Sequence, residues 1–300
     1  MIKWILGIIV FVFVALFLWT AFQSIREDGD LVGSVLSNSL LGGIGDAATR
    51  GLSLYQGESD APLVTFEELG EFSPAQGQVN ILREAENPQS DVIQEEYIIL
   101  EASETNIQPI SITGWSLQSM VSNAIFNIPG GVSVYQMGEV NTAGDIVLAP
   151  GEQVIVGSGV SPVGVSFREN MCTGYLGSVQ DFEPRLNERC PTPREILPPT
   201  LENIKTLGDS CVDFAARFDE CTYLTSDTPG FSTLSQACRE HLQPKLTYTS
   251  CVLENKSDPT FIGNGGWRIF LGSTTEVWRN KYEVIRLLDE NARTVDVFTY

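Results

Sequence analysis

The 300-residue sequence predicts a mainly β protein: an antiparallel β-sandwich, a cysteine-bearing α-helical unit inserted into it, and a transmembrane helix before it. Three observations predict this architecture: an uncharged apolar run near the start, short strand-like segments in two stretches, and six cysteines between those stretches. Regular short strands with turn signals between them are typical of antiparallel sandwiches. The expected parts are a transmembrane signal anchor at 1–23, a membrane-proximal spacer at 24–75, a sandwich at 76–165 and 261–300, and a cysteine-containing insertion with helices at 166–260.

The apolar run extends from Ile5 to Phe22 and contains no charged residue. As a helix it would be about 27 Å long, close to the hydrocarbon thickness of a bilayer. Lys3 precedes the run and acidic residues follow it, which predicts a cytoplasmic N-terminus and an extracytoplasmic C-terminal domain, single-pass in the cytoplasmic membrane. A cleaved signal peptide is the alternative, but the length of the run and the lack of a following A-x-A pattern favour an uncleaved anchor.

The spacer is first rich in Gly and Ser and then acidic, with Pro and Gly. We expect short helices in it at most, because Gly42, Gly43 and Gly45 make a long helix costly. An amphipathic helix lying on the membrane is the alternative, but the basic face that would bind anionic lipids is missing.

Apolar segments with β-type alternation predict the strands of the sandwich. Trp115, Trp267 and Tyr97 lie on such segments and are expected in the core, since a Trp on a sandwich strand usually fills it. The expected strands are 79–82, 96–102, 110–117, 124–129, 132–135, 145–148, 153–156, 267–271, 275–278, 283–289 and 294–300.

The insertion holds all six cysteines. An even number of cysteines in an oxidising compartment favours disulfides. Zinc is the alternative, but there is no C-x-x-C knuckle and His241 is the single histidine of the chain. The cysteines are Cys172, Cys190, Cys211, Cys221, Cys238 and Cys251.

Helical signals in the insertion suggest a disulfide pairing. Thr200 can cap a helix that starts at Leu201. Cys211 and Cys221 belong to a series of apolar residues at helical spacing, which places both cysteines on one face of a helix. A second helix passes through Cys238 until Pro244. If the two helical segments run antiparallel, the expected bridges are Cys221–Cys238, Cys211–Cys251 and, by what remains, Cys172–Cys190.

Four segments stand out as motifs: EEYIILEA at 95–102, ISITGWSL at 110–117, DIVLAPGEQVIV at 145–156 and IRLLDENARTVDVFTY at 285–300. They resemble motifs of the lamin-tail domain family, whose fold is an immunoglobulin-like β-sandwich. They follow one another in the order of the family, although Asn291-Ala292 stands where a glycine is usual. The chain is similar to bacterial membrane-anchored lamin-tail-domain proteins that contain cysteines. The resemblance implies a binding or scaffolding module.

Charge and composition limit the function. With 18 basic and 38 acidic residues, the formal net charge is −20, which disfavours binding to a phosphate backbone. We therefore expect a binding or structural module of the cell envelope, and not an enzyme. It is expected to contact the bilayer through Ile5–Phe22 and to bind an envelope protein or glycan. No catalytic residue, cofactor or metal ligand is assigned. The alternatives are an extracytoplasmic hydrolase that uses paired carboxylates and a DNA-binding envelope protein.

Overall fold

The computed structural model describes residues 62, 64–83, 87–263 and 265–300. The predicted transmembrane helix at Ile5–Phe22 and most of the predicted spacer lie outside these residues. Among the helices that are described, none has the length and apolar character needed to cross a bilayer.

The described residues form three sheets, and nearly all neighbouring strands in them are antiparallel. A five-stranded sheet has the order β1 (Val79–Ile81), β2 (Tyr97–Ala102), β7 (Gln153–Gly157), β9 (Trp267–Phe270) and β8 (Phe167–Arg168). A four-stranded sheet has the order β11 (Thr294–Thr299), β10 (Val284–Leu288), β4 (Ser116–Ser119) and β5 (Ile125–Asn127). A small sheet pairs β3 (Ile110–Ser111) with β6 (Val147–Leu148).

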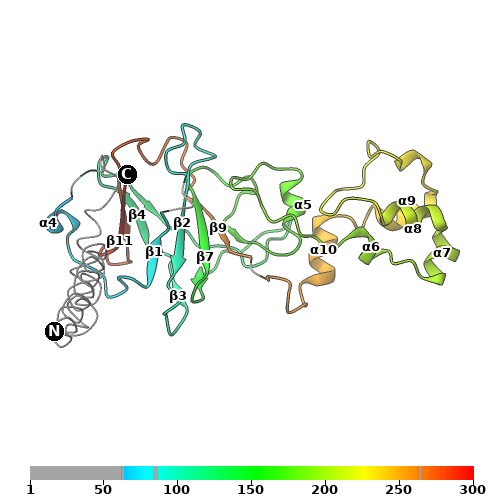
Figure 1. Ribbon diagram of the computed structural model, residues 1–300, viewed down its shortest axis with the longest axis horizontal. Coiled ribbons are helices and arrows are strands. Elements are labelled where there is room, and N and C mark those ends of the chain that lie inside the picture. Colours follow the sequence, from blue (N-terminus) through cyan, green and yellow to red (C-terminus); the bar gives the residue numbers. More distant parts are fainter. Residues whose placement is uncertain (1–61, 63, 84–86, 264) are drawn as a thin grey trace, which may run out of the picture. The chain divides into compact units, whose positions relative to one another are not determined.

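The pair β7 and β9 is parallel, so the prediction of a purely antiparallel arrangement is wrong there. Parallel neighbours require a long crossover connection, and the cysteine-containing segment supplies one. In Figure 1 the late strand β9 runs beside the green strand β7. Strand β8 also pairs with β9, so the five-stranded sheet continues past the predicted boundary at residue 165.

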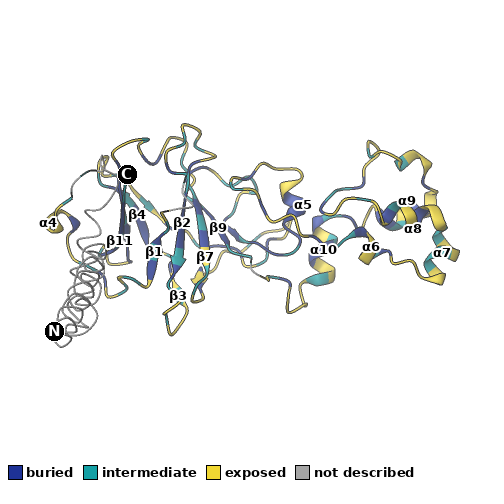
Figure 2. Cartoon of the chain, in the orientation of Figure 1, coloured by how far each residue is buried: buried dark blue, intermediate teal, exposed yellow. Residues whose placement is uncertain are grey.

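One hydrophobic cluster takes side chains from both larger sheets. Residues with period-two spacing supply it, as expected where one face of each strand is buried. Trp115 and Trp267 belong to this cluster, whereas Tyr97 is only partly buried and is not a member of it. Figure 2 shows β1 and β9 mostly in the buried colour, whereas along β7 buried residues alternate with less buried ones. The strand residues of the cluster are Val79, Ile81, Ile98, Leu100, Ala102, Leu117, Val154, Val156, Trp267, Ile269, Ile285, Leu287, Val295 and Phe298.

Three predicted strands differ from the structure. The segment 110–117 is split into β3 and β4 because Gly114 has a φ of +83°, and the Thr113 hydroxyl accepts a hydrogen bond from the Ile146 N–H at 2.7 Å. The segment 132–135 makes only an isolated bridge, from Val132 to Phe167. The segment 275–278 is a loop that a buried carboxylate holds, as described below.

The folded unit begins before the predicted start of the sandwich at residue 76. A short helix, α4 (Phe66–Leu69), starts with a capping box between Thr65 and Glu68. At its end the Leu69 carbonyl accepts hydrogen bonds from Arg286 at 2.5 Å and from the Thr294 hydroxyl at 2.6 Å. The last part of the predicted spacer is therefore packed on the four-stranded sheet.

Helices occupy the segment between β8 and β9. Thr200 caps α7 as predicted, because its side chain accepts a hydrogen bond from the Asn203 N–H. Helix α8 ends at Ala215, so the predicted helical face does not continue to Cys221. In Figure 2, α7 is coloured mainly as exposed, and it contains no buried residue. The helices are α5 (Gly174–Gly177), α6 (Pro193–Ile196), α7 (Leu201–Leu207), α8 (Asp209–Ala215), α9 (Gln236–Leu242) and α10 (Tyr248–Asn255), with a 3-10 turn at Phe231–Thr233.

All six cysteines form disulfides, which confirms their predicted bonding state. The predicted pairing is wrong in all three bridges: the structure joins Cys172 to Cys251, Cys190 to Cys221, and Cys211 to Cys238. Cys221 lies beyond α8 with a φ of +56°, so it does not share a helix with Cys211. Cys251 lies on the separate helix α10. The assumed pair of helices carrying two cysteines each is therefore absent from the described insertion.

Candidate functional site

A cleft of about 660 Å³ is the candidate site. It forms beside β7 and β9, where the turn before β7, the end of β8, the residues near 185 and the glycine-rich loop before β9 meet. Its volume lies within the range of about 300–1,000 Å³ that is usual for ligand clefts. The lining residues are Ala149, Pro150, Gly151, Glu152, Gln153, Ile155, Arg168, Glu169, Arg185, Asn187, Gly263, Gly265, Gly266 and Trp267.

Arg168 is held from three sides in this cleft. Its Nη2 forms an ion pair with Glu152 Oε1 at 2.7 Å, and its Nε donates to the Gly265 carbonyl at 3.4 Å. Its guanidinium carbon lies 5.7 Å from the centre of the Trp267 ring, within the range of a cation–π contact. Glu152 is itself oriented, because its Oε2 accepts a hydrogen bond from the Ala149 N–H at 2.9 Å. The guanidinium is therefore positioned before any ligand binds.

A second ion pair, between Glu169 and Arg268, supports one wall of the cleft. The Glu169 Oε1 to Arg268 Nε distance is 2.5 Å, and both side chains are almost fully buried. Arg268 also donates to the carbonyls of Pro184 and Arg185, and Glu169 Oε2 accepts from the Asn187 N–H at 3.3 Å. A buried ion pair requires such additional hydrogen bonds to offset its desolvation. The pair thereby fixes the backbone that carries the side chains of Arg185 and Asn187.

The loop before β9 must contain glycine because the backbones approach closely. A Cβ at Gly265 would lie 2.1 Å from the Glu169 carbonyl oxygen, and a Cβ at Gly266 would lie 2.7 Å from the Gln153 carbonyl oxygen. Both contacts are shorter than any side chain permits. The Gly265-Gly266-Trp267 sequence therefore shapes this side of the cleft.

The remaining donors of the cleft are exposed. Arg185 and Asn187 are both solvent-exposed, and within the described part of the chain the Arg185 guanidinium has no ion-pair partner. The two carboxylates that line the cleft, Glu152 and Glu169, are each engaged by an arginine. The polar groups that line the cleft can both donate hydrogen bonds to a negatively charged ligand and accept hydrogen bonds from it.

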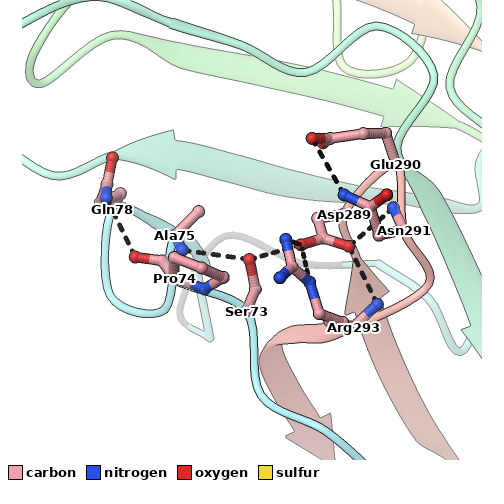
Figure 3. Close-up of polar contacts among 8 residues, drawn as sticks. All are labelled: Ser73, Pro74, Ala75, Gln78, Asp289, Glu290, Asn291 and Arg293. Carbon is pink, nitrogen blue, oxygen red and sulfur yellow. Dashed lines mark hydrogen bonds and ion pairs between the residues drawn. The ribbon is translucent and has the colours of Figure 1, made fainter.

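A smaller hollow of about 300 Å³ lies near Trp115 and the turn between β10 and β11. Figure 3 shows its main polar group, the Asp289 carboxylate, in contact with Ser73 and Arg293. The Ser73 hydroxyl donates to it at 2.7 Å, the Arg293 Nη2 lies 2.9 Å away, and the N–H groups of Asn291 and Arg293 donate at 2.9 Å.

These contacts change the acidity of Asp289. Burial acts to raise its pKa, but the hydrogen bonds from Arg293, Ser73 and Asn291 outweigh burial and lower the pKa to about 2. Both carboxylate oxygens are occupied by groups of the protein. Asp289 therefore stabilises the turn and the preceding segment, and the hollow beside it offers a ligand little free polar surface.

Two other buried carboxylates anchor the loop before β10. Glu96 accepts hydrogen bonds from the N–H groups of Val277 and Trp278 at 3.0 and 2.9 Å, and burial raises its pKa while these bonds oppose the shift. Glu283 accepts from the Ser119 hydroxyl at 2.9 Å and from the Arg279 N–H at 3.1 Å. Both groups satisfy buried backbone or hydroxyl donors, which is a structural role.

The residues singled out in the sequence lie elsewhere, apart from Trp267, which lines the cleft. His241 is partly exposed on α9, where burial and the nearby charge of Lys245 lower its pKa. No group of three or more His, Cys, Asp or Glu side chains suited to hold a metal occurs in the described part of the chain. Arg168, Glu169 and Arg185 were not predicted from the sequence as site residues. The Pro150-Gly151-Glu152 turn was recognised as a motif, but its contact with Arg168 joins positions that local pattern does not connect.

Comparison with known proteins adds no relative. No protein-family model, no curated protein and no solved structure matches the chain.

Proposed function

We propose that the chain is a membrane-anchored, extracytoplasmic binding module of the cell envelope, with an immunoglobulin-like sandwich of the lamin-tail class. The four motif segments support the proposed fold because they form adjoining elements: β2, β3 with β4, β6 with β7, and β10 with β11. A single core shared by two sheets is what a sandwich requires. The three disulfides support an oxidising location outside the cytoplasm.

The observation that carries the binding function is the preorganised Arg168. A guanidinium held by Glu152, Gly265 and Trp267 is a ready recognition group for an anionic ligand. Arg185 lies beside it and has no ion-pair partner among the residues that the structure describes. Preorganisation reduces the entropy that binding would otherwise cost. Because Glu152 and Glu169 are both engaged by arginines, the cleft is better suited to hold a ligand than to hydrolyse a glycosidic bond.

A charge reversal in the cleft tests this function. The full chain, purified in mild detergent and fluorescently labelled, is mixed with washed cell-envelope fragments, and the bound fraction is measured by sedimentation. We expect Arg185→Glu to weaken retention at least tenfold. Arg189→Glu is the matched control, because Arg189 is exposed in the same segment and does not line the cleft. Equal retention of wild type and both variants would show that the cleft is not the binding site.

A further inference from the structure

The charges of the cleft differ in sign from those of the whole chain. The molecule carries a formal net charge of −20, whereas Arg168, Arg185 and the supporting Arg268 outnumber Glu152 and Glu169 at the cleft. Such a local excess of positive charge attracts anionic ligands at short range, although the overall charge opposes strongly anionic polymers at long range. The favoured ligand is therefore a short anion that the cleft contacts directly, and not a long polyanion.

The free donors define which anion fits. Arg168 uses Nη2 and Nε on Glu152 and Gly265, and its Nη1 has no acceptor in the described residues. Arg185 is free of ion pairs there, and its guanidinium has the planar arrangement of donors that matches a carboxylate in two parallel hydrogen bonds. The cleft thus offers donors suited to carboxylate groups.

The other lining groups favour hydroxyls between those carboxylates. Asn187 can donate and accept at once, Gln153 can accept while its amide nitrogen donates to Glu101 at 2.7 Å, and the carboxylates of Glu152 and Glu169 accept. A peptide of Asp or Glu brings as many carboxylates as a uronic-acid oligomer of equal length, but its side chains have no hydroxyl donors for these acceptors. A sugar chain with one carboxylate per ring presents hydroxyl donors to the same acceptors.

We infer that the cleft binds a short carboxylate-bearing glycan, an oligomer of uronic-acid type, with its carboxylates on Arg185 and on the Nη1 of Arg168. This inference rests on the proposed function of the cleft as a binding site. It assigns the glycan, and not an acidic peptide, as the ligand.

Isothermal titration calorimetry of the full chain in detergent tests the ligand class with three probes. They are tetragalacturonate, its methyl ester, which lacks the charges, and a tetraglutamate peptide. We expect tetragalacturonate to bind at least ten times more tightly than either of the other two. Arg185→Ala should weaken its binding at least tenfold, and Arg185→Lys should restore only part of it, because lysine keeps the charge without the two-point geometry.

Arg189→Ala serves as the control and should bind tetragalacturonate like the wild type. Equal affinity for the acid and its ester, or tighter binding of tetraglutamate, would overturn the inference. If none of the probes binds while Arg185→Glu still abolishes retention on envelope fragments, the ligand class is wrong and the proposed binding function stands. If Arg185→Glu has no effect on retention either, both proposals fail.

Discussion

Ala292 adopts a left-handed backbone conformation in the turn between β10 and β11, with a φ of +60°. This conformation costs an L-residue about 1–2 kcal/mol, and glycine avoids the cost. We expect Ala292→Gly to stabilise the protein by about 0.5–1 kcal/mol, after the greater entropy of the unfolded glycine chain is subtracted. Ala292 is exposed, so little packing is lost. The measurement is urea unfolding under oxidising conditions.

Ala216→Gly is the control for this substitution. Ala216 is also exposed but has a φ of −67°, which alanine adopts without strain. The same change there should destabilise the protein by about 0.5–1 kcal/mol. If both substitutions act in the same direction, backbone strain at Ala292 does not explain the effect.

Asp289 makes stability depend on pH. Its folded pKa is lowered to about 2 from an ordinary value of 3.8, so its contribution to stability is present above pH 4 and is lost as the pH falls through about 2. We expect Asp289→Asn to lower the melting temperature at pH 7, and the difference from wild type to shrink between about pH 4 and pH 2. An identical substitution at the exposed Asp181 should have little effect. A constant difference over this range would contradict the assignment.

At the scale of elements, the segment at 65–75 belongs to the folded unit. Leu69 is buried, its carbonyl accepts from Arg286 and Thr294, and the Ser73 hydroxyl donates to Asp289. A chain that starts at residue 76 loses these contacts. We expect its free energy of unfolding to be about 2–4 kcal/mol lower than that of a chain that starts at residue 64. The difference comes from the lost burial of one leucine and the loss of two to three hydrogen bonds. Equal unfolding midpoints in urea would refute this boundary.

Local pattern could predict most strands but not the pairing of the cysteines. Alternating residues such as Ile98, Leu100 and Ala102 identify β2 because burial on one face has a period of two. The position of Cys221 depends on where α8 ends and on a positive φ at a non-glycine residue, and neither has a clear local signal. Because the length of this helix was predicted wrongly, the predicted pairing of all three bridges was wrong as well.

At the scale of the whole molecule, the two sheets depend on the last part of the chain. Strand β9 lies between β7 and β8, and β10 lies between β11 and β4, so both are interior strands. We expect a chain that ends at residue 260 to show no cooperative transition in urea. The measurement is tryptophan fluorescence as a function of urea concentration. A cooperative transition, with β-type circular dichroism, would show that the sheets form without these strands.

The same long-range connections explain why the cleft was not predictable. Glu152, Arg168 and Trp267 come together through the parallel pair of β7 and β9, which joins residues on either side of the insertion. Each residue has an ordinary local environment in the sequence, and only the sheet order places them side by side. The Pro150-Gly151-Glu152 turn was visible as part of a motif, but the residues that it contacts were not.

The disulfide connectivity makes the helical segment a closed covalent ring. The Cys172–Cys251 bridge spans 79 positions and encloses the other two, which interleave, since Cys211 lies between Cys190 and Cys221. A protease that cuts one peptide bond anywhere inside this ring cannot release a fragment. The two halves of the β domain thus stay on one molecule after a cut, and damage in the exposed helices does not separate the strands that build the cleft.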